Sequence, residues 1–445
     1  MSSLRVAGIA ARAARTSLLR ASASRVNGSV AATRKFHTSP VVRGSQDLIN
    51  EENSFSAHNY HPLPVVFSRA EGCHVWDPEG KHYYDFLSAY SAVNQGHCHP
   101  KIIGAAIEQL KNVTLSSRAF HNDVFPKFAH YVTEYFGFDR VLPMNTGAEA
   151  VETALKISRK WGHQVKGIKS ETAKVIACDE CFHGRTIGAI SLSNDPEARK
   201  GFGPFLPGIL KVPFNDLAAL ETCLKANHED TAAFIVEPIQ GEAGVYVPDE
   251  GYLTKARELC KKYNVLFVAD EVQTGVARTG KMLAIDHENI KPDILILGKA
   301  ISGGVYPVSA VLANNDVMDV ITPGTHGSTY GGNPVGCATA IAALQVIKDE
   351  GLVERSAHLG EILRQGLRDI KSPLVTTVRG KGLLNAFIID NSKGIPAWDV
   401  CMQLKEKGLL CKPTHDNIVR LAPPLVISEP EIRECIEILG SVLRR

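Results

Sequence analysis

Long apolar runs and a disulfide-type cysteine pattern are both missing from this sequence. No uninterrupted apolar stretch reaches the ~18 residues of a transmembrane helix, so we expect no membrane-spanning segment. Ten cysteines in 445 residues are too few for a disulfide scaffold and are consistent with a reducing compartment. The 44% hydrophobic and 22% charged residues are typical of a soluble globular enzyme with one large domain and a smaller one.

Acidic side chains are absent from residues 1–46, which contain seven Arg and one Lys. This Arg-, Ala- and Ser-rich stretch predicts a mitochondrial transit peptide over residues 1–43, and hence a location in the mitochondrial matrix; a disordered basic arm is the alternative. Residues 34–39 resemble the two-step mitochondrial processing pattern, which would start the mature chain near Gly44. The rest of the chain has 41 basic and 47 acidic residues, which argues against nucleic acid or an anionic membrane as the main partner.

Two groups of metal-ligand residue types lack further ligands in the sequence. Cys178 and Cys181 form a Cys-x-x-Cys pair, but no second pair follows at the spacing of a zinc site. The His-Cys-His run at 97–99 precedes Pro100, which indicates the start of a helix. We therefore expect a structural loop at 97–99 and no metal site.

Helix-length segments alternate with short apolar runs from about residue 100 onward, which favours a mostly parallel sheet covered by helices. The central strand candidates are Lys174–Cys178, Ala232–Glu237, Val265–Asp270, Ile294–Leu297 and Val308–Ala313. Strand-like pieces near the two ends are Val65–Phe67, Cys73–Trp76, Lys81–Phe86, Val375–Ile389 and Ile418–Leu421. Helix candidates are Gly251–Tyr263, 334–350, Ala397–Lys407 and Glu429–Leu443. We predict an α/β chain with a large domain at 99–341 and a small α+β domain built from 44–98 and 342–445.

Lys299 and Asp270 each close an apolar run of strand length. Neighbouring buried strands would bring the amine and the carboxylate to the same edge of one sheet. Pyridoxal phosphate chemistry needs these two groups, an amine that forms a Schiff base and an acid that pairs with the pyridine nitrogen. The alternatives are a solvated lysine and, for Asp270, a helix cap. A desolvated amine tends to lose its proton and becomes nucleophilic, which favours the cofactor interpretation.

Three glycine-containing loops are candidates for binding phosphate. The loop 144–150 precedes an amphipathic helical pattern, and the free N–H groups of a helix start bind anions; Thr146 with Glu149 also fits a capping box without any ligand. The loop 326–333 is rich in donors and glycine, and is either part of a phosphate site or a surface turn. The loop 275–281 imitates a nucleotide-binding loop by chance, since Met282 replaces the Ser or Thr that must reach Mg²⁺.

The motifs around these residues resemble those of class III aminotransferases, pyridoxal-phosphate enzymes of fold type I, over residues 47–445. The stretches that carry the resemblance are Asn59–Pro64, Ser91–His97, Val141–Gly147, Gly201–Phe205, Val236–Glu242, Ala269–Gln273, Leu297–Lys299 and His326–Gly332. The resemblance implies the large and small domains of fold type I and pyridoxal 5'-phosphate as cofactor.

The resemblance also implies roles for residues around the cofactor. Lys299 would hold the cofactor and carry the proton, and Asp270 would pair with the pyridine nitrogen. The remaining implied contacts are phosphate binding by Gly147, Ala148 and the neighbouring subunit's copy of residue Thr329, stacking by Phe182, and a bond from Gln273 to the phenolic oxygen. A homodimer or higher homo-oligomer would then be needed for a complete site.

The members of this family that act on ornithine are the most similar. They imply transfer of the δ-amino group of L-ornithine to 2-oxoglutarate, with acetylornithine or 4-aminobutyrate as alternative donors. Tyr60, Tyr90 and Arg185 would bind ornithine. Arg420 would take the α-carboxylate of 2-oxoglutarate, and Glu242 would screen Arg420 while ornithine is bound, because an exposed arginine would attract the wrong end of that substrate. His183 stands where a bulkier aromatic is usual in the animal members, and we expect it to affect only the edge of the cofactor site.

Overall fold

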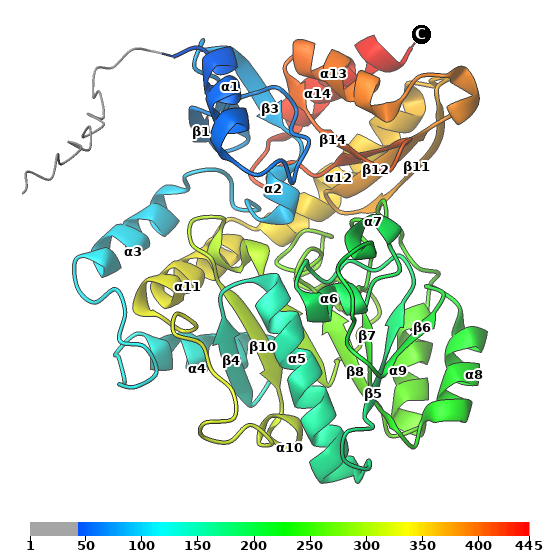
Figure 1. The fold of residues 1–445 in the computed structure, drawn as a ribbon. Helices are drawn as coiled ribbons and strands as arrows, with labels where there is room; N and C mark the ends of the chain where they lie inside the picture. Colours follow the sequence, from blue (N-terminus) through cyan, green and yellow to red (C-terminus); the bar gives the residue numbers. More distant parts are fainter. Residues whose placement is uncertain (1–42, 445) are drawn as a thin grey trace, which may run out of the picture. The chain divides into compact units, whose positions relative to one another are not determined.

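The computed structural model describes residues 43–444 (Figure 1). The predicted transit peptide therefore lies outside the described residues, except for its last position. The helices are α1 Ser45–Phe55, α2 Ser88–Ser91, α3 Pro100–Leu110, α4 Phe125–Phe136, α5 Gly147–Trp161, α6 Ile187–Ser191, α7 Pro196–Arg199, α8 Leu217–Asn227, α9 Tyr252–Lys262, α10 Asn315–Met318, α11 Pro334–Asp349, α12 Leu352–Asp369, α13 Ala397–Glu406 and α14 Glu429–Leu443. Short π or 3₁₀ turns are η1 Gly162–Lys166, η2 Ala284–His287, η3 Lys299–Ser302 and η4 Asn391–Lys393.

A seven-stranded sheet forms the centre of the chain. In spatial order its strands are β4 Arg140–Met144, β10 Ser309–Ala313, β9 Ile294–Leu297, β8 Leu266–Asp270, β7 Thr231–Val236, β5 Lys174–Cys178 and β6 Ile209–Val212. The pairs from β9 to β6 are parallel, whereas β10 is antiparallel to both of its neighbours. The connection from β9 to β10 is too short for the crossover that a parallel strand needs, which explains this reversal. The predicted α/β class with a mostly parallel sheet is confirmed.

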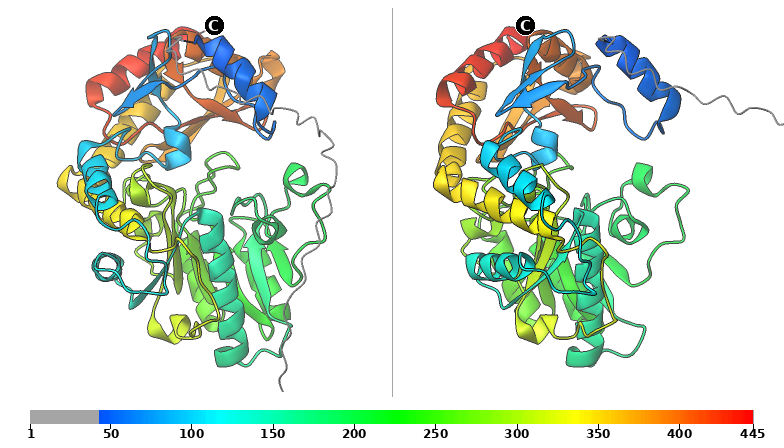
Figure 2. Two further views of the ribbon diagram at one scale, coloured as in Figure 1. Left: turned by 60° about the vertical axis from the view of Figure 1, so that its left-hand side comes forward. Right: turned by 90° about the vertical axis from the view of Figure 1, so that its left-hand side faces the viewer.

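The two faces of this sheet are buried against different helices, because successive strand residues point to opposite sides. Along β8, Leu266 and Val268 pack with α5, while Phe267 and Ala269 pack on the side of α8, α9 and α11. Figure 2 shows α5 and α11 on opposite sides of the sheet. Burial on both faces explains why these strands read as continuous apolar runs in the sequence.

Two four-stranded sheets contain the segments near the two ends. One has the order β1 Arg69–Glu71, β2 His74–Trp76, β3 His82–Asp85 and β13 Leu409–Leu410. The other has the order β11 Val375–Lys381, β12 Leu384–Ile389, β15 Ile418–Leu421 and β14 Lys412–Thr414. Because β3 pairs with β13 in parallel, the first sheet joins residues about 325 positions apart, as between Tyr84 and Leu409. The blue and orange segments accordingly lie together in Figure 1.

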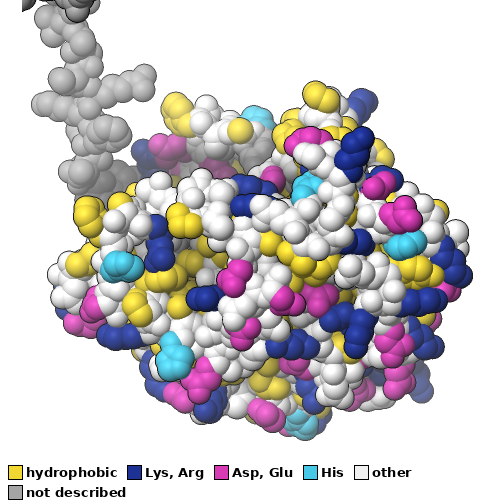
Figure 3. All heavy atoms as spheres, turned by 90° about the horizontal axis from the view of Figure 1, so that it is seen from below, with side chains coloured by type: hydrophobic (Ala, Val, Ile, Leu, Met, Phe, Trp, Pro, Cys, Tyr) yellow, Lys and Arg dark blue, Asp and Glu magenta, His cyan; other side chains and the backbone are white. Residues whose placement is uncertain are grey.

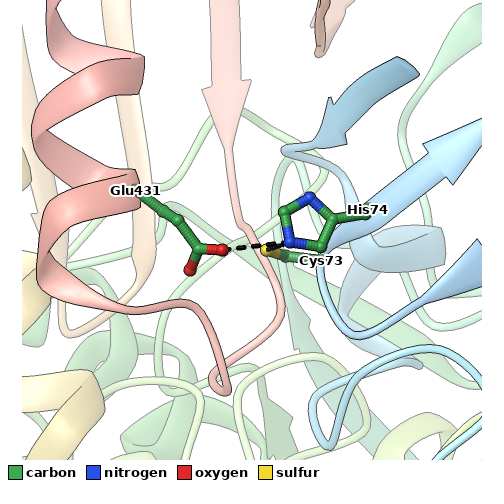
Figure 4. Close-up of side chains that lie close together, drawn as sticks. All are labelled: Cys73, His74 and Glu431. Atoms are coloured by element: carbon green, nitrogen blue, oxygen red, sulfur yellow. Dashed lines mark hydrogen bonds and ion pairs between the residues drawn. The ribbon is translucent and has the colours of Figure 1, made fainter. Parts of the chain in front are cut away.

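The side chains Cys73, His74 and Glu431 add a second contact between the two ends (Figure 4). His74 Nε2 lies 3.0 Å from the Glu431 carboxylate and 3.7 Å from Cys73 Sγ. Glu431 also accepts a hydrogen bond from the backbone of Ser428, the N-cap of α14. One carboxylate therefore caps the C-terminal helix and ties it to β2.

Most of the expected elements form within one or two residues of the predicted bounds, but the strand expected at Val65–Phe67 does not form. Pro62 and Pro64 just before it lack backbone N–H donors, and the segment stays partly exposed. The expected strand Val375–Ile389 is instead a hairpin, β11 and β12, that turns at Gly382 with a φ of 51°. None of the helices within residues 43–444 combines the length and apolar character needed to cross a bilayer.

Candidate active site

Asp270 and Lys299 meet at the carboxyl edge of the central sheet, as the sequence predicts. Asp270 is the last residue of β8 and is paired with Ile296 of the neighbouring strand β9. Lys299 follows β9 after one residue, Gly298, and has a positive φ of 46°, a conformation that costs energy in a non-glycine residue. Burial lowers the pKa of the Lys299 amine to about 8, and the charge of Arg420 lowers it as well, against the opposing effect of Glu242. The lysine is therefore far closer to its neutral, nucleophilic form than a lysine in water.

A histidine and a second carboxylate surround Asp270. His183 Nδ1 lies 2.6 Å from the Asp270 carboxylate, and both side chains are buried. Burial alone would lower the pKa of His183, but the neighbouring Cys181 and the hydrogen bond to Asp270 raise it above the usual value. Glu237, the residue after β7, accepts a hydrogen bond of 2.9 Å from the Phe182 backbone, and burial raises its pKa to about 7. Asp270 is thus no helix cap but one member of a buried titratable cluster.

The N-terminus of α5 faces the same cavity. Thr146 caps the helix, accepting from the Glu149 backbone at 3.2 Å while the Glu149 carboxylate accepts from the Thr146 backbone at 2.8 Å, so the predicted capping box forms. A Cβ added to Gly147 would lie 2.8 Å from Val272, which shows how closely the helix start approaches the Asp270 loop. The cavity of about 150 Å³ is lined by Gly147, Ala148, Phe182, His183, Gly184, Glu237, Asp270, Val272, Gln273 and Lys299.

An arginine–glutamate pair stands beside this cavity. Arg420 on β15 is buried, and its two terminal nitrogens lie 2.7 and 3.4 Å from the two Glu242 oxygens. Its Cζ atom lies 4.9 Å from the Tyr90 ring, and its Nε has no hydrogen-bond partner among the described residues. An Arg–carboxylate pair with an unused donor can exchange its protein carboxylate for one from a ligand.

Tyr90 belongs to a left-handed turn. All four residues of α2, from Ser88 to Ser91, have φ between 48° and 69°. For non-glycine residues this conformation costs roughly 1–2 kcal/mol each. Hydrogen bonds from the Leu87 and Ser88 backbones to Asp85, at 2.8 and 2.9 Å, hold the turn. The protein therefore maintains a strained segment at the position that carries Tyr90.

Besides Tyr90, Glu242 and Arg420, three further residues expected at the site lie outside the small cavity. Tyr60 is 68% exposed and lines a separate cavity of about 610 Å³ together with Tyr90. Arg185 is exposed, with its Cζ 5.2 Å from the Phe182 ring, and lines a small hollow shared with Glu242. Thr329 is exposed on the loop after α10 and does not line any of these three cavities. Of the expected residues, Gly147, Ala148, Phe182, Asp270, Gln273 and Lys299 line the small cavity together.

Comparisons with known proteins agree with this arrangement. The family model for class III aminotransferases matches residues 55–443. The ornithine aminotransferase of Emericella nidulans is 59% identical, with 94% of this chain and 93% of that protein covered. The chain belongs to the class III aminotransferase family.

Two solved structures of this family are also similar. An ornithine aminotransferase of Toxoplasma gondii superposes with a TM-score of 0.89 at 49% identity, covering 91% of this chain and 95% of that one. An acetylornithine aminotransferase of Elizabethkingia anophelis gives a TM-score of 0.82 at 55% identity, covering 90% and 99%. Several curated ornithine aminotransferases among the relatives are named as mitochondrial.

Class III aminotransferases depend on pyridoxal phosphate, and the residues of this aminotransferase fit that cofactor. The N-terminus of α5 offers free N–H groups for a phosphate, and Asp270 offers a carboxylate for a ring nitrogen. Lys299 supplies a desolvated amine that lines the same cavity. A Cβ at Gly241 would collide with the amide of Gln273, so any larger residue there would displace the Gln273 side chain.

The sequence interpretation of this aminotransferase missed the contacts of His183 and Glu237. We expected His183 to affect only the edge of the site, and the structure corrects this, because its imidazole contacts the Asp270 carboxylate directly. Glu237 comes directly after the fully buried β7, and Asp270 is the last residue of the fully buried β8, so the same argument from strand ends identifies both.

Proposed function

We propose that this aminotransferase transfers the δ-amino group of L-ornithine to 2-oxoglutarate. The products are glutamate 5-semialdehyde, which cyclises to 1-pyrroline-5-carboxylate, and glutamate. The observation that carries the proposal is the ion pair between the buried Arg420 and Glu242, whose charges both act on Lys299. Arg420 is neutralised while Glu242 binds it and becomes a free cation when Glu242 leaves. The first state suits ornithine, whose reacting end has no carboxylate, and the second suits 2-oxoglutarate, whose reacting end has one.

The cofactor residues act by position and charge. Bound pyridoxal phosphate supplies the electron sink for transamination. Asp270, supported by His183, would pair its carboxylate with the pyridine nitrogen. Gly147 and Ala148 would bind the phosphate through their backbone N–H groups, and Phe182 would contact the ring. Gln273 would bind the phenolic oxygen, and the amine of Lys299 would hold the cofactor and move the proton.

The substrate residues select the reacting end. While Glu242 occupies Arg420, the α-carboxylate of ornithine is not attracted to the reaction centre, and the δ-amine approaches Lys299 instead. When 2-oxoglutarate binds, its α-carboxylate replaces Glu242 on Arg420. Tyr60 and Arg185 bind the distal α-end of ornithine. Tyr90 lines the space between that end and the reacting δ-amine.

Donor specificity tests this proposal. We expect kcat/KM to be highest for L-ornithine among L-ornithine, N-acetylornithine and 4-aminobutyrate, and Lys299→Ala to abolish steady-state turnover of all three. A preference for N-acetylornithine would refute the choice of donor and favour acetylornithine aminotransferase activity, which the similarity to the Elizabethkingia anophelis enzyme keeps as the second candidate. Turnover retained by Lys299→Ala would refute the catalytic assignment itself.

We also propose a mitochondrial matrix location, a homodimer and the division into domains at 44–98, 99–341 and 342–445. The acid-free N-terminus supports import, and the pairing of β3 with β13 supports a small domain built from both ends. The exposed position of Thr329 supports a role in the site of a second copy. Figure 3 shows acidic and basic side chains interspersed on one face, which suits small-molecule substrates better than nucleic acid.

A further inference from the structure

Cys73, His74 and Glu431, which join the two ends of the chain, are three side chains of the types that bind zinc. One ligand atom from each lies within 4.8 Å of the other two, and Figure 4 shows the side chains converging from the start of β2 and from α14. His74 Nε2 lies 3.7 Å from Cys73 Sγ and 3.0 Å from Glu431 Oε1. The bond lengths of a tetrahedral zinc site separate sulfur and nitrogen by about 3.6 Å, and nitrogen and oxygen by about 3.4 Å. The cluster is therefore close to the geometry of a zinc site.

The ligand atoms are held in place by further contacts. The second Glu431 oxygen accepts hydrogen bonds from the Ser428 backbone and hydroxyl, at 2.7 and 2.6 Å, which leaves Oε1 facing His74. His74 Nδ1 lies 2.9 Å from His82 Nε2. A metal-binding histidine typically donates its other ring N–H to an acceptor, because this bond fixes the ring and its tautomer. Cys73 is buried, so packing limits the direction of its thiol.

The ligand types and their charges favour Zn²⁺ among the divalent cations. Mg²⁺ and Ca²⁺ prefer oxygen ligands, whereas a thiolate with an imidazole suits zinc. One thiolate and one carboxylate together carry two negative charges, which balance the charge of the ion. The side chains of His74 and Glu431 are 30% and 25% exposed, so water can reach a fourth ligand position.

We propose that Cys73 Sγ, His74 Nε2 and Glu431 Oε1 bind one Zn²⁺ ion, with water as the fourth ligand. The ion takes the place of the proton between His74 and Glu431, so that His74 becomes the Nδ1–H tautomer and donates to His82. The coordinating thiol loses its proton to solvent. Because the ligands come from both ends of the chain, bound zinc stabilises the packing of α14 against the sheet that contains β2.

Zinc binding to the untagged holoenzyme, after removal of metals with a chelator, tests this proposal. Calorimetry should show one Zn²⁺ per chain, and Cys73→Ser should raise the Kd at least a hundred-fold, on the order of or above the loss caused by removing a partner outside the ligand set. Glu431→Gln, which keeps an acceptor for Ser428, should also weaken binding. His82→Phe should raise the Kd about ten-fold by releasing the imidazole ligand. Cys98→Ser, the matched change at an exposed cysteine, should leave the Kd unaltered.

Cobalt provides a measurement that needs no variant. Co²⁺ added to the unmodified holoenzyme should give the visible bands of a tetrahedral ion and a thiolate charge-transfer band, read as the difference from the spectrum without cobalt. Zn²⁺ should raise the Tm of the unmodified enzyme more than that of Glu431→Gln. Absence of the thiolate band, or a zinc affinity that neither Cys73→Ser nor Glu431→Gln changes, would overturn the site. If Cys73→Ser fails to fold, the cobalt spectrum and Glu431→Gln still decide.

Discussion

At the scale of single residues, the active site depends on titratable side chains that are buried next to one another. Asp270 and Glu237 are two carboxylates at the ends of neighbouring strands, and His183 contacts one of them. A buried carboxylate without a partner is costly, so the histidine stabilises the charged form of Asp270. That is the form that a protonated pyridine nitrogen requires.

Replacing His183 should therefore affect catalysis more than folding. We expect His183→Phe to lower kcat/KM for ornithine about ten-fold, since a charge-assisted hydrogen bond to Asp270 is lost. The pH at which the absorbance of the bound cofactor titrates should also shift. His183→Gln keeps a hydrogen-bond donor and should lose less activity.

A control separates this positioning role from a packing role. His121→Phe changes an exposed histidine and should leave activity and spectrum unaltered. If His183→Phe lowers the melting temperature but leaves the pH titration of the cofactor unchanged, the histidine serves packing and not Asp270.

Sequence patterns predict some of these residues and not others, for a physical reason. Lys299 and Asp270 are recognisable because each lies at the carboxyl end of a buried apolar strand, and adjacent parallel strands end at one edge. The contact between His183 and Asp270 joins residues 87 positions apart through an irregular loop, and no periodic pattern encodes it.

At the scale of secondary-structure elements, close backbone contact determines the cofactor site. The start of α5 lies against Val272, and Gly298 before Lys299 approaches the same side chain, with a Cβ there 3.2 Å from Val272. Glycine at both positions lets the helix terminus, the Asp270 loop and the lysine turn meet.

Adding a methyl group at this contact should weaken cofactor binding. Gly147→Ala would place a Cβ 2.8 Å from Val272 Cγ1, so the helix start must move. We expect the Kd for pyridoxal phosphate, measured by titrating the apoenzyme, to rise about ten-fold, equivalent to one lost phosphate hydrogen bond.

A second substitution shows whether this contact is the cause. Val272→Ala removes the opposing methyl groups and should restore much of the affinity in the Gly147→Ala background. Gly104→Ala, at a helix position with open space around it, should leave the Kd unchanged. An equal Kd in Gly147→Ala and the unmodified enzyme would show that the helix terminus tolerates the shift.

Elements are predictable from the sequence where both faces of a strand are buried, and less so elsewhere. Strand β4 was not expected because it contains Pro143, which is tolerated there since β4 is an edge strand. The left-handed turn of α2 contains no glycine to mark it, and it depends on Asp85 and on the hydrogen bond of 2.7 Å from Ser88 to Ala422, over 300 residues away.

At the scale of the whole molecule, segments distant in sequence are bound together by buried polar contacts. Arg278 is fully buried and donates to Asn94, to the Leu383 carbonyl and to the Pro423 carbonyl. A short run near the N-terminus, the central segment and the C-terminal strands thus share one side chain. Such long-range contacts follow from the final topology, so composition and periodicity cannot predict them.

The proposed dimer leads to a prediction about mixed subunits. If Thr329 acts in the site of its partner, a dimer of one Lys299→Ala chain and one Thr329→Val chain contains one site with both residues intact. The mixed dimer should then have about half the activity of the unmodified enzyme. Each parent should be poorer: Lys299→Ala inactive, and Thr329→Val with cofactor affinity about ten-fold lower through loss of one phosphate bond.

The measurement needs differently tagged chains, co-expressed and purified as mixed dimers, and assayed at limiting pyridoxal phosphate so that weakened sites stay empty.

The opposite assignment, in which Thr329 acts in the site of its own chain, gives a different result. Were Thr329 to serve its own chain, one site would lack Lys299 and the other would lack Thr329, and the mixed dimer could not exceed half the activity of the Thr329→Val parent. Activity above both parents therefore requires a site shared between two subunits.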